Sequence, residues 1–330
     1  MWYSSGKDTD IALWILLKST ALVAFAGAAA AGGHTSISFS GNASAEYNSL
    51  GGLNTDADLD ATMSADLNNG LTVSTKISLD TTNYDGNVGG AAAGSLTLSS
   101  DTASLTFGND ITSASFSAVG DTIGFGDGED GIQGVIGSYT MGAATLFVSM
   151  PVGAGDTAVL STDIEVGVTA AVGAMTVGLA MADSDFVGKV SGTAAGATFT
   201  VAAGSVADVN RWDATVAYPV GAVTIGYTVD GSDAWEVSAA YAEGGISAKA
   251  TYLSTETFKI EGSFDAGNGV VVNAGYLEAS DEMYVGGSYE LGGGASAYAS
   301  YVDSATATAA SEVGGPDYAG GTTVGVSFTF

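Results

Sequence analysis

The feature that most constrains this chain is a repeated alternation of apolar and polar residues along short segments. A period of two places one set of side chains on one face of a β-strand and the other set on the opposite face. Such a strand has one apolar face and one polar face. The segment 36–47 alternates throughout, with Ile37, Phe39, Gly41, Ala43, Ala45 and Tyr47 against Ser36, Ser38, Ser40, Asn42, Ser44 and Glu46.

The alternation recurs as far as the last segment, 324–330. Residues 58–67 and 71–80 repeat it on either side of Asn68-Asn69-Gly70, which is typical of a hairpin turn. No segment between residues 32 and 330 shows a clear helical period. Counting the hairpins predicts an all-β chain of roughly 16–20 antiparallel strands.

Two architectures accommodate so many strands. In a soluble sandwich the apolar faces would pack together and be filled by bulky side chains, whereas here they are mostly Ala, Gly and Val. In a transmembrane up-and-down β-barrel they face lipid, and the polar faces line a lumen. Aromatic residues near the predicted strand ends favour the barrel, because such residues mark the membrane interfaces: Trp212, Tyr218, Tyr227, Trp235, Tyr241, Tyr252 and Tyr276.

The first 31 residues are predicted to be a secretory signal peptide. Lys18 precedes a short apolar run and then Gly27 and a run of alanines, a small-residue cleavage site. A transmembrane anchor is the alternative, but no basic cluster follows the run. The first 17 residues are unusual for a signal and suggest an upstream start codon or an artefact. Residues 32–330 would then form the barrel.

The charge and the missing residue types exclude several functions. A formal net charge of −29 leaves no basic patch for nucleic acid. The chain has no cysteine and one histidine, His34, which excludes Cys–His and Ser–His–Asp catalytic sites and most zinc sites. We therefore predict no catalytic residues, no enzymatic activity and no cofactor, with Ca²⁺ as the one candidate ion.

The few basic residues beyond the signal peptide share one property, which is that each alternates with apolar neighbours on the polar face of its strand. A charge on the lipid face near mid-membrane would cost about 2–4 kcal/mol. We therefore expect all five to face the lumen: Lys76, Lys189, Arg211, Lys249 and Lys259.

The longest segment without alternation, Asp110 to Gly137, is rich in glycine and carboxylates. A loop of this length is usually functional or disordered. We expect it to fold into the pore as a constriction loop; a solvated extracellular loop is the alternative. Its last three acidic residues could also bind Ca²⁺, although they lack EF-hand spacing. The carboxylates are Asp110, Asp121, Asp127, Glu129 and Asp130.

Together these features resemble the general porins of Gram-negative bacteria, particularly the alphaproteobacterial type. The signal peptide, the alternating strands, the acidic loop, the stretch 289–296 and the terminal segment 324–330 carry the resemblance. It implies an outer-membrane protein in contact with lipid and lipopolysaccharide, assembled as a homotrimer. It also implies that Phe330 is recognised by the outer-membrane assembly machinery and that the loop is the constriction. The arginine cluster usual opposite that loop is absent here.

The sequence thus predicts a passive diffusion channel for small hydrophilic solutes and ions. Its carboxylates would raise the local concentration of cations and make it weakly cation-selective. Two alternatives stay open. One is a Gly- and Asp-rich structural or adhesive surface protein, such as a β-solenoid; the other is a substrate-specific outer-membrane channel.

Overall fold

The computed structural model describes residues 35–67, 70–80, 93–120, 122–123, 125, 132–151, 164–303 and 318–330. Within these residues the chain forms twenty strands and one short helix. The elements are β1 (Thr35–Asn48), β2 (Gly52–Asp66), β3 (Thr72–Asp80), β4 (Ala93–Ser99), β5 (Ala103–Ile111), α2 (Ala114–Val119), β6 (Ile132–Met141), β7 (Ala144–Pro151), β8 (Glu165–Val172), β9 (Met175–Ala182), β10 (Asp185–Ala194), β11 (Ala197–Val206), β12 (Val209–Val220), β13 (Val223–Asp230), β14 (Trp235–Glu243), β15 (Ile246–Leu253), β16 (Phe258–Gly267), β17 (Val270–Leu277), β18 (Glu282–Gly292), β19 (Ala295–Val302) and β20 (Gly321–Thr329).

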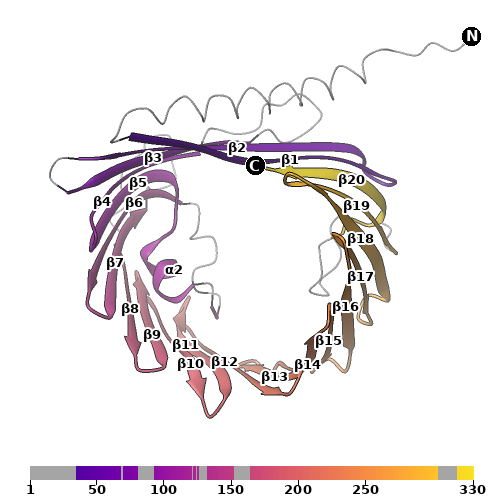
Figure 1. Ribbon diagram of the computed structural model, residues 1–330. Helices are drawn as coiled ribbons and strands as arrows, with labels where there is room; N and C mark the ends of the chain where they lie inside the picture. The colour runs from indigo at the N-terminus through magenta and orange to yellow at the C-terminus, as the bar shows by residue number, and fades with distance from the viewer. Residues whose placement is uncertain are drawn as a thin grey trace, which may run out of the picture.

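The sheet is closed. Each strand pairs antiparallel with its neighbours in the sequence, and β20 pairs with β1. Figure 1 shows the result as a ring of strands around an open centre. The predicted up-and-down barrel is confirmed, at the upper end of the predicted strand range, and this antiparallel order excludes the solenoid. No helix in the described ranges is long and apolar enough to span a bilayer.

The alternation in the sequence becomes the two faces of the barrel. On β16, Phe258, Ile260 and Phe264 are exposed, and the residues at the odd-numbered positions between them point to the opposite face. Opposed residues in an antiparallel ladder share a face, so the register carries this arrangement from strand to strand around the ring. Exposed large hydrophobic residues recur on nearly every strand. So much exposed apolar surface matches a barrel whose outside contacts hydrocarbon.

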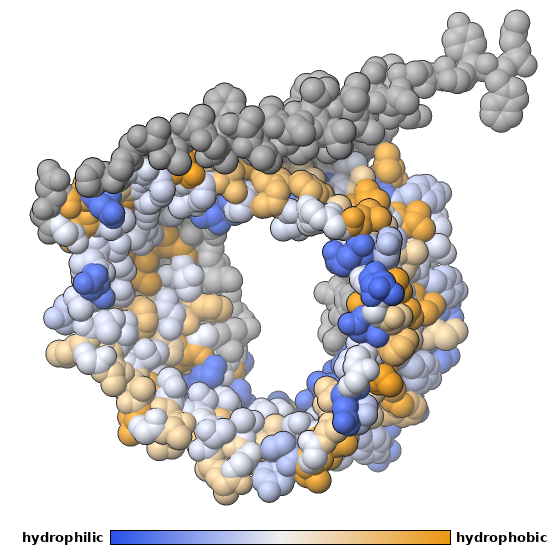
Figure 2. Space-filling model, in the orientation of Figure 1, coloured by the Kyte–Doolittle hydropathy of each residue, from blue (hydrophilic) through white to orange (hydrophobic). Residues whose placement is uncertain are grey.

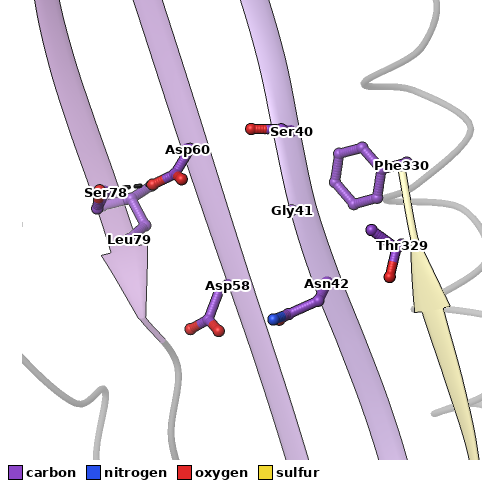
Figure 3. A pocket seen from close by; sticks show the side chains of 9 residues that line it. All are labelled: Ser40, Gly41, Asn42, Asp58, Asp60, Ser78, Leu79, Thr329 and Phe330. Atoms are coloured by element: carbon purple, nitrogen blue, oxygen red, sulfur yellow. Dashed lines mark hydrogen bonds between the residues drawn. The ribbon is translucent and has the colours of Figure 1, made fainter. Parts of the chain in front are cut away.

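The seam between β1 and β20 is fixed near the end of the chain. Gly41 and Phe330 exchange two backbone hydrogen bonds, of 3.1 and 3.0 Å. The Phe330 ring lies where a Cβ on Gly41 would project, beside the opening drawn in Figure 3. It also stacks on Phe328, with the ring centroids 5.7 Å apart. A glycine opposite the last residue therefore lets the aromatic ring lie flat on the seam.

The other end of the seam depends on Asn48, which is buried. Its amide nitrogen donates hydrogen bonds of 2.8 Å to the Gly320 carbonyl and the Thr323 hydroxyl. Its side-chain carbonyl accepts from the backbone N–H groups of Leu50 and Gly51. One side chain thus joins the turn after β1 to the start of β20.

The two rims of the barrel carry different connections. One rim has short turns such as 142–143, 173–174 and 244–245, and the other has the longest connections, 112–131 and 303–320. The turn after β6 uses Gly142 at a φ of 62°, a left-handed conformation that glycine adopts without strain. Outer-membrane barrels have short periplasmic turns and longer extracellular loops. The short-turn rim, where β20 ends, therefore corresponds to the periplasmic side.

Candidate functional site

The connection after β5 carries helix α2 inside the ring of strands (Figure 1). Ser113 caps the helix by accepting a hydrogen bond from the Phe116 N–H, and Gly120 ends it at a φ of 65°. The predicted bounds of the irregular segment were wrong, because Asp110 belongs to β5 and residues 132–137 belong to β6. The helix was not predicted either. Its six residues are too few to display a helical period.

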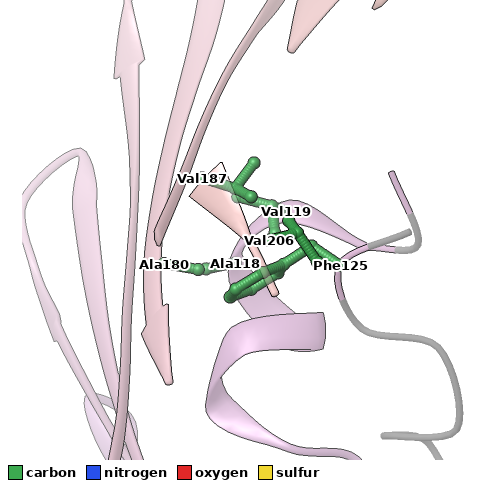
Figure 4. Packing of buried hydrophobic residues seen from close by; sticks show 6 residues of the cluster. All are labelled: Ala118, Val119, Phe125, Ala180, Val187 and Val206. Atoms are coloured by element: carbon green, nitrogen blue, oxygen red, sulfur yellow. The ribbon is translucent and has the colours of Figure 1, made fainter. Parts of the chain in front are cut away.

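An apolar cluster holds α2 against the inner wall. Figure 4 shows side chains from the helix and the residues that follow it meeting side chains of β9, β10 and β11. The wall is shaped to receive the helix, because a Cβ on Gly167 or Gly178 would collide with backbone carbonyls of α2. Small residues at inward positions thus allow close packing. The cluster comprises Ala118, Val119, Phe125, Ala180, Val187 and Val206.

A buried polar network lies beside this cluster. Glu165, on the inner face of β8, accepts hydrogen bonds from the Ser115 hydroxyl at 2.9 Å and the Ser149 hydroxyl at 3.1 Å. The Ser149 oxygen also accepts from the Ala114 N–H at 2.8 Å. Glu165 is only 7% exposed, so its carboxylate depends on these donors for stabilisation. This role could not be predicted for Glu165, since its partners come from distant segments of the chain.

Two of the predicted lumen cations contact the same inward connection. The Lys189 ammonium donates to the Val119 carbonyl at 2.7 Å, at the C-terminal end of α2. The Arg211 guanidinium donates to the Ile123 carbonyl at 3.3 Å. A cation at a helix C-terminus is favourable because the exposed carbonyls carry partial negative charge. Both residues therefore position the connection as well as carrying charge.

The other three predicted cations lie elsewhere on the wall. Lys76 forms an ion pair of 3.1 Å with Asp60 on the neighbouring strand. Lys249 lies directly opposite Glu261 in the ladder between β15 and β16. Lys259 lies opposite Thr251 in the same ladder. The basic residues are thus distributed over several strands and form no single cluster.

Carboxylates dominate the polar face of β1 and β2. Asp56, Asp58 and Asp60 occupy alternate positions of β2, so their side chains share a face (Figure 3 shows the last two). Glu46 on β1 accepts a hydrogen bond of 2.7 Å from the Tyr298 hydroxyl. We call these four residues the acidic wall. They are not among the predicted site residues, although the spacing of three aspartates at every second position of β2 was a signal for them.

Four of the predicted loop carboxylates, Asp121, Asp127, Glu129 and Asp130, lie outside the described residues, as do residues 1–31. The Ca²⁺ site proposed for the last three therefore stays a prediction. In the part of the chain that the structure describes, no group of three or more His, Cys, Asp or Glu is placed to hold a metal ion.

Comparison with solved structures finds porins with low sequence identity. A mutant of Rhodopseudomonas blastica porin is 15% identical, with 89% of this chain and 100% of that chain covered and a TM-score of 0.42. A porin structure refined at 1.8 Å resolution is 18% identical, with the same coverage and a TM-score of 0.40. Comparison with curated proteins finds no match.

The sequence match is more extensive. The family model described as Gram-negative porin matches residues 19–308, which is most of the chain. The match agrees with the closed antiparallel barrel and its exposed apolar outer face. The protein therefore belongs to the Gram-negative porin family of the bacterial outer membrane.

Proposed function

We propose that this porin is a passive diffusion channel for small hydrophilic solutes and ions, with a weak preference for cations. Family membership and the passage visible through the ring in Figure 2 support the diffusion channel. The acidic wall is the observation that carries the cation preference. It faces the lumen from β1 and β2, whereas the nearest cation, Lys76, is already paired with Asp60.

The preference is weak for a physical reason. The carboxylates raise the local concentration of cations near the wall. In salt of physiological strength their field decays over about 8 Å, so ions near the middle of a wide passage feel little of it. Helix α2, which lies inside the ring against β7 to β10, would narrow the passage and bring ions closer to the charged surface. In this proposal the inward connection is the constriction.

Recordings in planar bilayers under a KCl gradient test this function. We expect ohmic conductance and a zero-current potential of the sign given by higher K⁺ than Cl⁻ permeability. A potential of the opposite sign would disprove cation preference while leaving the channel itself intact. Absence of conductance from protein with the heat-modifiable gel migration of a folded barrel would disprove the channel.

The predicted loop carboxylates have a test of their own. Asp121, Asp127, Glu129 and Asp130 should be replaced together by their amides. We expect the K⁺/Cl⁻ permeability ratio to fall, since carboxylates at a constriction act at short range. An unchanged ratio would mean that these residues lie away from the ion path. Repeating the recording with EDTA tests whether Ca²⁺ occupies the last three of them.

We also propose the maturation route that the family suggests. Residues 1–31 would be removed as a signal peptide, Phe330 would be recognised by the assembly machinery, and the barrel would form a homotrimer in contact with lipopolysaccharide. N-terminal sequencing of outer-membrane protein tests the cleavage. Native mass spectrometry of detergent extracts tests the trimer, and deletion of Phe330 should lower the yield of assembled protein.

A further inference from the structure

A recess in the lumen wall, over β14 to β18, presents two opposite charges whose side chains form no salt bridge. Lys249 and Glu261 are direct cross-strand partners, and both line this recess. Even so, their side chains do not form the salt bridge that Lys76 and Asp60 form elsewhere on the wall. The Oε2 atom of Glu261 is buried and has no hydrogen-bond partner there. A buried carboxylate oxygen without a donor is costly, so a ligand that supplies a donor would be stabilised.

Two further residues give the recess a fixed shape. Tyr284 is 4% exposed, and its ring lies over Gly275, where a Cβ would collide with it. Asn273 is 8% exposed and donates a hydrogen bond of 3.2 Å to the Tyr318 hydroxyl. Tyr318 in turn packs edge-on against Tyr284, with the ring centroids 5.6 Å apart. These contacts hold both side chains in place before any solute arrives.

The chemistry of the recess is complementary to a solute with two charged ends. The unpartnered Glu261 oxygen can accept from an ammonium group. The Asn273 amide nitrogen donates the bond to Tyr318, which leaves the side-chain carbonyl able to accept from the ammonium as well. The Lys249 ammonium can pair with a carboxylate.

From these observations we propose that the recess formed by Lys249, Glu261, Asn273 and Tyr284 is a transient binding site for small zwitterions of the amino-acid type. The proposal rests on the channel function above and adds a solute class to it. A solute bound here would be retained briefly on its way through the lumen. Flux of that class would therefore saturate with concentration, whereas flux of an uncharged solute would not.

The probe is glycine, and its uncharged isomer glycolamide is the matched solute. Uptake of each into proteoliposomes is measured over a range of concentrations. We expect glycine uptake to saturate and glycolamide uptake to rise linearly. Lys249→Gln and Glu261→Gln should each raise the half-saturating glycine concentration about threefold. Lys76→Gln, which removes a lumen cation outside the recess, should leave it unchanged.

Three results would overturn the proposal. Linear uptake of both solutes, with KCl conductance intact, would remove the binding site but leave the channel function standing. A second contrary result has two parts: glycine uptake stops saturating in Glu261→Gln but not in Lys249→Gln, and methylammonium uptake saturates as glycine uptake does. The recess would then be a cation site that does not recognise zwitterions. Absence of KCl conductance from folded barrels would refute the channel, and the binding site with it.

Discussion

Two regions of the inner wall have the same alternation of apolar and polar residues, but one is covered by packed protein and the other is exposed to water. On β7 to β10 the inward residues include glycines, an alanine and a buried glutamate, and α2 covers them. On β1 and β2 the inward residues are mainly aspartate, asparagine and serine, and they face an open recess (Figure 3). The first region is packed like a protein interior, and the second is a hydrated wall.

Two properties of the sequence account for this difference. Alternation decides which residues point inward, because the period of a strand is fixed. The size and polarity of the inward residues then decide whether a segment can pack on them. Gly167 leaves room for a helix backbone, whereas Asp58 extends a charge that water must solvate. Substitutions at both regions can break or sharpen this contrast.

Removal of the buried carboxylate should have the largest effect. Glu165→Ala leaves the Ser115 and Ser149 hydroxyls buried without their acceptor, which should weaken docking of α2 by about 3 kcal/mol. The measurement is the rate of chymotrypsin cleavage after Phe116, which we expect to rise about 100-fold if cleavage follows the detached population. Glu236→Ala is the control, since Glu236 has no hydrogen bond to α2. Equal rates in the two variants would contradict the role of Glu165.

A side chain added beneath α2 should have the second-largest effect. Gly167→Val introduces a side chain that collides with α2, at a cost of about 2 kcal/mol. The same protease assay should show an increase of about 30-fold. Gly137→Val is the matched control, because a Cβ there would meet nothing closer than 3.7 Å. If Gly167→Val behaves like this control, α2 does not dock tightly on β8.

A smaller effect is expected at the end of the helix. Lys189→Gln removes the charged donor to the Val119 carbonyl, a loss of about 1 kcal/mol. We expect greater open-channel current noise in single-channel recordings, because α2 would detach more often. Lys189→Arg retains a cationic donor and should remain close to the native noise level. Equal noise in both variants would show that the lysine does not restrain the helix.

Substitutions in the acidic wall should have the smallest effect. Asp58→Asn should lower the K⁺/Cl⁻ permeability ratio by a factor of about 1.5, since solvent and salt screen a single exposed charge. Asp60→Asn should lower it further, because that change also frees the Lys76 charge from its ion pair. Zero-current potentials measure both ratios, and adding Lys76→Gln should reverse the extra loss. If Asp58→Asn lowered the ratio more than Asp60→Asn does, the Lys76–Asp60 ion pair would not control the charge that ions meet at this wall.

The sequence was sufficient for the barrel because its signal is local. Alternation around Ile37 or Phe258 indicates a two-faced strand regardless of what the rest of the chain does. The site was harder to predict, because its partners lie far apart in the sequence. Parity placed Lys189 on the polar face, but nothing local indicated that the Val119 carbonyl would accept a hydrogen bond from its ammonium group. Helix α2 escaped prediction since it is short, and its stability comes from a cap and from tertiary packing.

The hydrogen bonds of Asn48 have a consequence for biogenesis. Two of its partners, Gly320 and Thr323, are more than 270 residues further along the chain. While the polypeptide is still being exported, the Asn48 amide in the first hairpin has neither of these hydrogen-bond partners, and an incomplete sheet cannot supply them. Closure of the barrel would therefore be cooperative, because the contacts of the first hairpin form only when the last hairpin is in place. Truncating the chain before β20 should yield a degradable intermediate rather than a narrower pore.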